Sequence, residues 1–324
     1  MNGGHRSDDN RPGASHALAL FLSGCLAACS TIPERVSDYG PAAAAAELTG
    51  TPFHPQERYQ CGPAALMTIL EASGAGTDMD TLIRRVYLPA RQGSLQTELV
   101  AATRAEGRIP YQLAPKLSSL GAELKAGRPV LVLQNLGVSW LPRWHYAVVV
   151  GVNPEADEIV LRSGTERRRV TRTATFLRTW RRSGYWSLVA LRPGEMPAEA
   201  DRERWFDTLA ALEETGHIRN ARAGWQAALG QWPDATVARF GLANSEFLLG
   251  NWAGAEAGYR ALLVSQPGLV MVRNNLAAAL LKMERVDEAR DEAMRALRQA
   301  EGTAAYRQAI EETLAEIDAA AERM

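Results

Sequence analysis

The sequence predicts two folded regions, an α+β domain over residues 51–193 and an all-helical domain over residues 205–324, with a linker at 194–204. In the first region, helix-like patterns come first and short β-branched runs follow, which is typical of α+β domains with an antiparallel sheet. In the second region every segment is helix-like, and the pattern recurs after 34 residues. The Pro- and Gly-rich stretch 193–197 interrupts both patterns and therefore marks the boundary.

The composition is that of a folded protein, and the net charge argues against one class of partner. Of the 324 residues, 46% are hydrophobic and 23% are charged, as in globular chains. The net charge of -1 argues against nucleic acid as the main partner. No run of 18 apolar residues occurs, so we expect no membrane-spanning helix. We expect no cofactor either, because Cys61 is the only cysteine in the body of the chain and cannot form a cysteine-based zinc site.

Residues 1–28 have the layout of a secretory signal, with a short apolar stretch at 17–25 after two arginines. The segment that follows, Leu26-Ala27-Ala28-Cys29, resembles the lipobox of bacterial lipoproteins. This resemblance implies that Cys29 is lipidated and becomes the mature N-terminus. The only membrane contact would then be the lipid anchor, and an ordinary cleaved signal is the alternative.

The residues after the lipobox extend the same expectation. Ser30 resembles an outer-membrane address, which places the protein in the bacterial cell envelope facing the periplasm. Pro33, Pro41 and the alanine run 42–46 indicate a tether over residues 29–50.

The α+β region should contain three helices and four strands. Pro63 suits a first helical turn, and Leu66, Ile69 and Leu70 follow it at helical spacing. Asp78 belongs to a candidate cap for the second helix. The expected helices cover 61–72, the stretch after Asp78 through Tyr87, and 99–106; the expected strands cover 129–134, 145–152, 158–162 and 185–191.

Cys61 is the candidate nucleophile because it stands at a predicted helix start, directly after a polar loop. The positive end of the helix dipole and the free N–H groups there favour a thiolate. A thiolate nucleophile needs a base, which is usually imidazole. His145 opens a buried strand after the aromatic-rich loop 140–144, whereas His54 lies seven residues before Cys61 and His217 falls among the repeats.

A tetrahedral intermediate also needs hydrogen-bond donors for its oxyanion. The backbone N–H of Cys61 can supply one. A side-chain amide shortly before it can supply another, and both Gln56 and Gln60 are available. Gln56 lies far enough upstream for the loop to fold back beside the thiol.

The block from Gln56 through Cys61-Gly62-Pro63-Ala64-Ala65, followed by the His145 strand, resembles papain-like cysteine peptidases related to bacteriocin double-glycine leader peptidases. The resemblance covers residues 51–192 and implies Cys61 as nucleophile, His145 as base and Gln56 as oxyanion donor. Members of that family usually carry an aspartate after the histidine strand to orient the imidazole. Here the sequence at 161–164 has no acid, and Ser163 is left as the hydrogen-bond acceptor.

The helical region repeats itself in register. Four pairs are 34 residues apart: Gly216 and Gly250, Ala221 and Ala255, Trp225 and Tyr259, and Pro233 and Pro267. The Leu-Ala dipeptide at 242 recurs at 276. This period and order resemble tetratricopeptide repeats, which are stacked pairs of antiparallel helices. The third unit is expected to open at Asn275.

Together these features predict a lipid-anchored envelope cysteine peptidase that acts on a peptide or protein substrate and binds a protein partner through its repeats. One alternative is an inactive peptidase-like scaffold, which the missing acid favours. Another is a Cys-His acyltransferase or amidase, because the nucleophile does not define the acyl donor.

Overall fold

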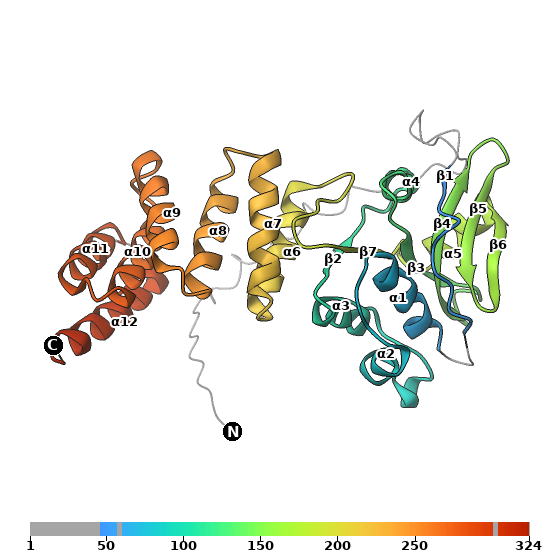
Figure 1. Cartoon of the computed structure of the whole chain (residues 1–324), viewed down its shortest axis with the longest axis horizontal. Coiled ribbons are helices and arrows are strands. Elements are labelled where there is room, and N and C mark those ends of the chain that lie inside the picture. The colour runs from blue at the N-terminus through green and yellow to red at the C-terminus, as the bar shows by residue number, and fades with distance from the viewer. Residues whose placement is uncertain (1–45, 57–59, 301–303, 324) are drawn as a thin grey trace, which may run out of the picture. The chain divides into compact units, whose positions relative to one another are not determined.

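The computed structural model describes residues 46–56, 60–300 and 304–323, and it contains an α+β region followed by an all-helical region (Figure 1). The fold class predicted from the sequence is confirmed. The predicted signal, the lipidation site Cys29 and most of the predicted tether lie outside the described residues. Among the described helices, none is both long and apolar enough to cross a membrane.

The α+β region is built on an antiparallel sheet with the strand order β2-β7-β3-β4-β5-β6. The short strand β1 pairs with the end of β4, at Val152 and Gly151, beyond the residues of β4 that β3 pairs. The strands are β1 (Ala46–Glu47), β2 (Ile109–Gln112), β3 (Val130–Asn135), β4 (Trp144–Asn153), β5 (Glu158–Ser163), β6 (Glu166–Arg172) and β7 (Ser187–Leu191).

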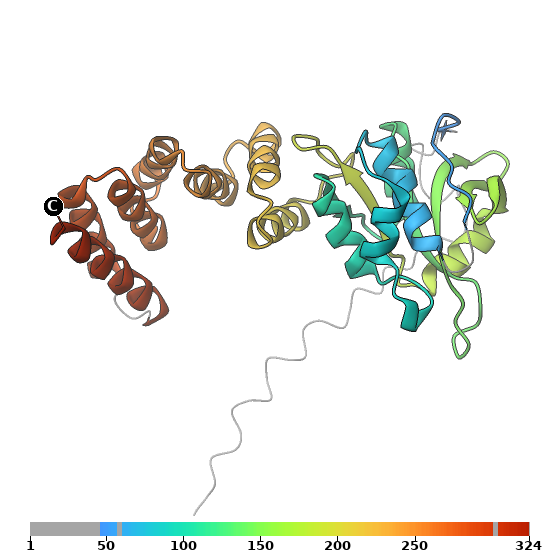
Figure 2. The ribbon, with the colours of Figure 1, turned by 60° about the horizontal axis from the view of Figure 1, so that its bottom comes forward.

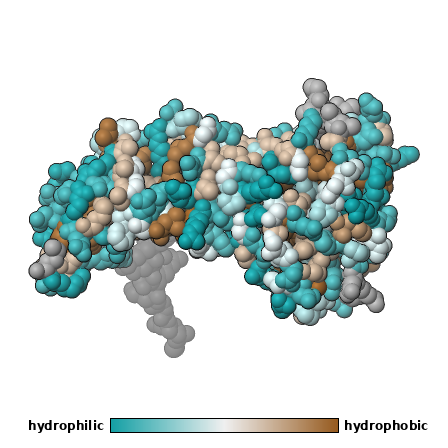
Figure 3. All heavy atoms as spheres, in the orientation of Figure 1, coloured by the Kyte–Doolittle hydropathy of each residue, from teal (hydrophilic) through white to brown (hydrophobic). Residues whose placement is uncertain are grey.

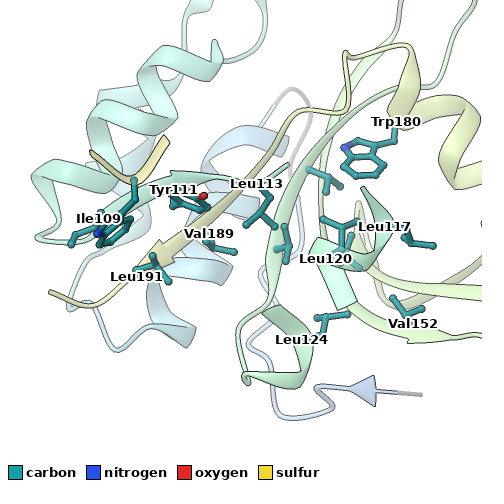
Figure 4. Packing of buried hydrophobic residues seen from close by; sticks show 14 of the residues in the cluster. Ile109, Tyr111, Leu113, Leu117, Leu120, Leu124, Val152, Trp180, Val189 and Leu191 are labelled. Atoms are coloured by element: carbon teal, nitrogen blue, oxygen red, sulfur yellow. The ribbon is translucent and has the colours of Figure 1, made fainter. Parts of the chain in front are cut away.

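Helices cover both faces of this sheet because its central strands are apolar on both sides. Leu131 and Val148 belong to the apolar cluster that includes α1 (Cys61–Ala72), α2 (Met79–Val86) and α3 (Gln96–Ala105). Their neighbours Val132 and Val149 belong to the opposite cluster, with α4 (Leu117–Lys125) and α5 (Thr173–Arg181). Figure 4 shows part of this second cluster. The alternation follows from the two-residue period of a strand.

The sequence located the elements around Cys61 better than those farther along the chain. The first helix has the predicted bounds, and Asp78 caps α2 by accepting the Thr81 N–H at 2.8 Å. The third helix begins at Gln96, three residues before the predicted start. In the α+β region the strands β1, β2 and β6, the helices α4 and α5 and the short helix η2 (Pro89–Arg91) were not predicted. In β6 the side chains are mostly charged and exposed, so the strand lacks the apolar alternation that would reveal it.

A buried arginine fastens the segment before α1 to the sheet. Arg162 on β5 is 4% exposed, and its guanidinium donates to the carbonyls of Thr49, Thr51 and Arg167. Burial lowers the pKa of this guanidinium. A buried cation is tolerated only when its donors are satisfied, so the three carbonyls fix the path of the chain toward Cys61.

The helical region repeats in three dimensions with the predicted 34-residue offset (Figures 1 and 2). Helices α6, α8 and α10 begin at residues 202, 236 and 270, and α7, α9 and α11 begin at 218, 252 and 286. The third unit therefore opens at Val270 and not at Asn275 as predicted, because the first five residues of α10 include none of those that marked the period. The bounds are α6 (Arg202–Glu214), α7 (Ile218–Gln231), α8 (Thr236–Leu248), α9 (Trp252–Ser265), α10 (Val270–Lys282), α11 (Val286–Gln299) and α12 (Ala304–Ala321).

The bonds at the ends of the repeat helices recur with the same offset. The Arg239 side chain donates to the carbonyl of Pro233 at 2.7 Å, and Arg273 donates to that of Pro267 at 3.2 Å. The residues that end α6, α8 and α10 have positive φ: 80° at Gly216, 81° at Gly250 and 61° at Glu284. The positive φ at Gly216 and Gly250 explains why glycine recurs at this position of the 34-residue period. The third unit has Glu284 at the equivalent position.

Candidate active site

Cys61 is the first residue of α1, and the helix behind it is almost entirely buried against the sheet. Three backbone N–H groups lie near its sulfur, those of Tyr146, Gly62 and Cys61 itself. These donors favour the thiolate, as the helix start predicts. Burial outweighs them, however, so that the pKa of the Cys61 thiol is raised above its ordinary value. The resting sulfur is therefore protonated near neutral pH.

His145 lies near the start of β4, opposite Gln134 on β3. Its Nε2 is 2.8 Å from the hydroxyl oxygen of Ser163, which ends β5 and is 4% exposed. This bond holds the ring and leaves Nδ1 free for proton transfer. Burial, together with the cations Arg169 and Arg143, lowers the pKa of His145 to about 4. The imidazole is therefore neutral at pH 7, which is the form a general base needs.

Gln56 is held next to the histidine strand. Its backbone N–H donates to the carbonyl of Gly164, at the turn between β5 and β6, and its side-chain Nε2 lies 3.4 Å from the Tyr146 carbonyl. The second N–H of this amide is available to a ligand. Gln60, the other candidate donor, directly precedes α1 and makes no side-chain bond to the helix.

One cavity of about 960 Å³ brings the predicted residues together. Gln56, Cys61 and His145 all line it, and Ser163 lies behind His145. The remaining lining residues come from the loop before α3, from β3 and β4 and from the end of α5: Arg91, Gln92, Gly93, Ser94, Leu95, Gln96, Leu133, Arg143, Trp144, Tyr146 and Ser183.

The two other histidines among the described residues, His54 and His217, do not line this cavity. His54 Nε2 bonds to a carboxylate oxygen of Glu71 at 2.7 Å, and His217 immediately precedes α7. Asn153, in the turn after β4, does not line the cavity either. Its side-chain oxygen accepts the N–H of Ala156 and caps that turn. Within the described part of the chain, no group of three or more His, Cys, Asp or Glu residues is placed to hold a metal ion.

Sequence reasoning missed the loop 91–96 as a wall of the cavity. Ser94 fits so closely over α1 that a Cβ on Gly62 would lie 2.3 Å from its hydroxyl oxygen, which explains the glycine after Cys61. The Tyr146 hydroxyl donates to the Ser94 carbonyl at 3.3 Å and fixes the loop. The loop 140–144 was expected to contribute aromatics, and Trp144 lines the cavity, while Trp140 is 85% exposed.

No protein-family model and no curated protein matches this chain. Among solved structures, a Bacillus anthracis protein described as a C39-like peptidase is similar over 46% of this chain and 98% of its own, with 14% identity and a TM-score of 0.38. The Yersinia enterocolitica type III secretion translocator chaperone SycD is similar over 40% of this chain and 90% of its own, with 15% identity and a TM-score of 0.36. The structure of SycD in complex with a peptide of the translocator YopD is similar over 37% of this chain and 92% of its own, with 15% identity and a TM-score of 0.35.

Proposed function

We propose that this protein is a cysteine peptidase in which Cys61 is the nucleophile, His145 the general base and Gln56 an oxyanion donor, with Ser163 orienting the imidazole. The observation that carries the proposal is the convergence of Gln56, Cys61 and His145 on one cavity, from two parts of the chain that are more than 80 residues apart in the sequence. The bond from His145 to Ser163 adds the third group that a thiol–imidazole pair requires.

In this mechanism the Cys61 thiol gives its proton to His145 Nδ1 as the sulfur attacks the scissile carbonyl carbon. The carbonyl oxygen becomes an oxyanion, which the Cys61 N–H and the free N–H of Gln56 stabilise. His145 then donates the proton to the leaving amine, and a thioester remains on Cys61. Water then attacks the thioester carbonyl and gives a proton to His145; as the C–S bond breaks, the acid product leaves and His145 returns the proton to the Cys61 sulfur.

The decisive test is hydrolysis of a peptide mixture by the full chain and by its Cys61→Ala variant. We expect cleavage by the wild type alone, with an intact fold in both proteins by circular dichroism. A thioester trapped on Cys61 and released by hydroxylamine would identify the intermediate. Retained hydrolysis by Cys61→Ala would contradict the proposal.

An inactive scaffold is the second candidate, because Ser163 stands where an orienting carboxylate is expected and a serine stabilises imidazolium less well. A peptide carrying a thiol-reactive group distinguishes the two. Selective labelling of Cys61 at pH 7, mapped by mass spectrometry and lost in Cys61→Ala, supports the peptidase. An unreactive Cys61 supports the scaffold.

We further propose lipidation at Cys29 and an envelope location, on the strength of the lipobox-like sequence. Metabolic labelling with palmitate should be lost in Cys29→Ala.

We also propose that the helical repeats bind a protein partner. Exposed apolar side chains on α8 and α9, including Leu248, Trp252 and Val264, support this, and Figure 3 shows apolar patches over the repeats. Replacing Leu248 and Val264 by serine should weaken capture of that partner without unfolding the repeats.

A further inference from the structure

Among the described residues, the lining of the candidate active-site cavity carries positive charge without a matching acid. Arg91 and Arg143 line it from two different loops, and no lining residue within the described chain is Asp or Glu. Neither guanidinium forms an ion pair with a carboxylate of a described residue. By contrast, Arg168 and Arg169 on the nearby strand β6 are paired with Glu47 and Glu166.

We infer that the cavity takes a peptide that carries a carboxylate next to the scissile bond, with Arg143 and Arg91 as the residues that select it. This inference rests on the proposed peptidase function and names its substrate class. A guanidinium presents a planar set of donors that matches the two oxygens of a carboxylate. Asp, Glu and the free C-terminus are the sources of that group in a peptide. Leu95, Leu133 and Trp144 supply apolar contacts for the rest of the substrate.

The position of the Arg143 backbone does not depend on the Arg143 side chain. The Asn135 side-chain oxygen accepts the N–H groups of Gly137 and Arg143, both at 2.9 Å, and closes the hairpin between β3 and β4. The guanidinium is exposed and forms no hydrogen bond or ion pair with another described residue, so replacing it changes the charge of the cavity and little else. Arg91 ends the short helix η2 (Pro89–Arg91) and is exposed as well.

A bound carboxylate would also act on the chemistry. Arg169 and Arg143 place a positive potential at His145, which disfavours its protonated form; Arg143 has no acidic partner among the described residues. An anion at Arg143 cancels part of that potential when His145 takes the thiol proton. The substrate would thereby supply some of the negative charge that a carboxylate in the place of Ser163 would give.

The experiment compares fluorogenic peptides that are identical except for Asp or Glu against Asn or Gln at the positions flanking the scissile bond. Each peptide is made with a free and with an amidated C-terminus, so that the two sources of carboxylate are separated. For the full chain at low salt, we expect the preferred acidic peptide to exceed its amide partner about tenfold in kcat/KM, the size of one charge-assisted hydrogen bond. The ratio should fall as salt rises.

Three variants assign the effect. Arg143→Gln and Arg91→Gln should each reduce the acid-to-amide ratio, and Arg143→Glu should reverse it in favour of Lys peptides. Arg178→Gln, on an exposed position of α5 away from the cavity, is the matched control and should keep the ratio. A ratio near one in the wild type, or a ratio unchanged in Arg143→Gln and Arg91→Gln together, overturns the inference.

Binding to Cys61→Ala separates this inference from the proposed function. Fluorescence anisotropy should show tighter binding of the acidic peptide than of its amide partner, and the difference should shrink in Cys61→Ala/Arg143→Gln. If that difference is present but the wild type cleaves nothing, carboxylate selection stands and the peptidase proposal fails. If the wild type cleaves acidic and amide peptides equally, the peptidase proposal stands and carboxylate selection fails.

Discussion

At the scale of single residues, Cys61 and His145 are both in their neutral forms near pH 7. Burial raises the pKa of the thiol and lowers the pKa of the imidazole to about 4. A resting thiolate–imidazolium pair is thus disfavoured, and in the proposed mechanism the proton would move as the sulfur attacks. The Ser163 hydroxyl, bonded to the ring, would stabilise imidazolium less than a carboxylate does.

The acid limb of the pH profile of kcat/KM should therefore lie at an unusually low pH. Because His145 must be neutral to act as base, kcat/KM should decline near pH 4 and not near pH 6.5, the ordinary value for histidine. In Ser163→Asp, the new carboxylate favours imidazolium and should move this limb upward by about 1–3 pH units. Ser163→Asn, which adds no charge, serves as the control. An acid limb that stays in place in Ser163→Asp would contradict this account.

The same pKa gives a stability prediction with a defined sign. The folded-state pKa of His145 lies below the unfolded value of 6.5, so the unfolded chain binds the proton more readily. Protonation of the unfolded state should lower the free energy of unfolding as pH falls from 6.5 toward 4, with no effect above that window. Denaturant titrations across this range should show a steeper loss in the wild type than in His145→Gln.

At the scale of elements, the close contact between α1 and the loop before α3 shapes the site. Gly62 has no Cβ, and Ser94 occupies the space that one would take. Gly62→Ala should push this loop away from Cys61 and reduce kcat/KM at least about tenfold, since small displacements of reacting groups are costly. Gly62→Ala/Ser94→Gly, which removes the clashing side chain, should recover part of the loss. No recovery would show that the clash is not the cause.

The ends of the repeat helices give an independent test. Glu284 has a φ of 61° where the other two units have glycine, and it bonds in the same way: its N–H donates to the carbonyl of Leu281. A side chain in this conformation is unfavourable, so Glu284→Gly should stabilise the repeats by about 1 kcal/mol. Thermal unfolding is the measurement, and Gly250→Ala should shift the midpoint in the opposite direction by a similar amount.

Local sequence patterns predicted those features of the fold that depend on a few neighbouring residues. The helix start at Cys61, the Asp78 cap and the 34-residue period each depend on a few neighbouring residues. The strand β6 was missed because an edge strand with exposed arginines has no apolar face. In the site, Gln56, Cys61, His145 and Ser163 were proposed from spacing and resemblance, but Ser94 and Arg91 were not. Their placement at the cavity depends on tertiary packing that the local sequence does not encode.

At the scale of the whole molecule, one apolar cluster includes residues of the sheet and of the first repeat helices. Trp205 on α6 is fully buried, and its ring meets that of Tyr111 on β2 edge-to-face, with centroids 5.8 Å apart. The segment before α6 makes polar contacts as well: Glu199 accepts from Ser119 at 2.9 Å. The stretch predicted as a linker is thus bonded to the α+β region.

Trp205→Ala should therefore uncouple the two regions. Loss of a buried tryptophan costs about 3–5 kcal/mol, and here the lost contacts belong to both the sheet and the repeats. We expect the calorimetric transition of the wild type to divide into two in this variant. Trp252→Ala, at a position 37% exposed on α9, is the control and should leave a single transition. One undivided transition in Trp205→Ala would refute the coupling.

The buried Arg162 has a practical consequence for protein engineering. Its guanidinium is satisfied by backbone carbonyls at Thr49 and Thr51, upstream of α1. A fragment that starts at residue 51 would remove one acceptor and the strand β1, and would leave a cation in the interior with too few partners. A transplantable α+β module must therefore start at or before Ala46, five residues earlier than the apolar pattern alone would place its border.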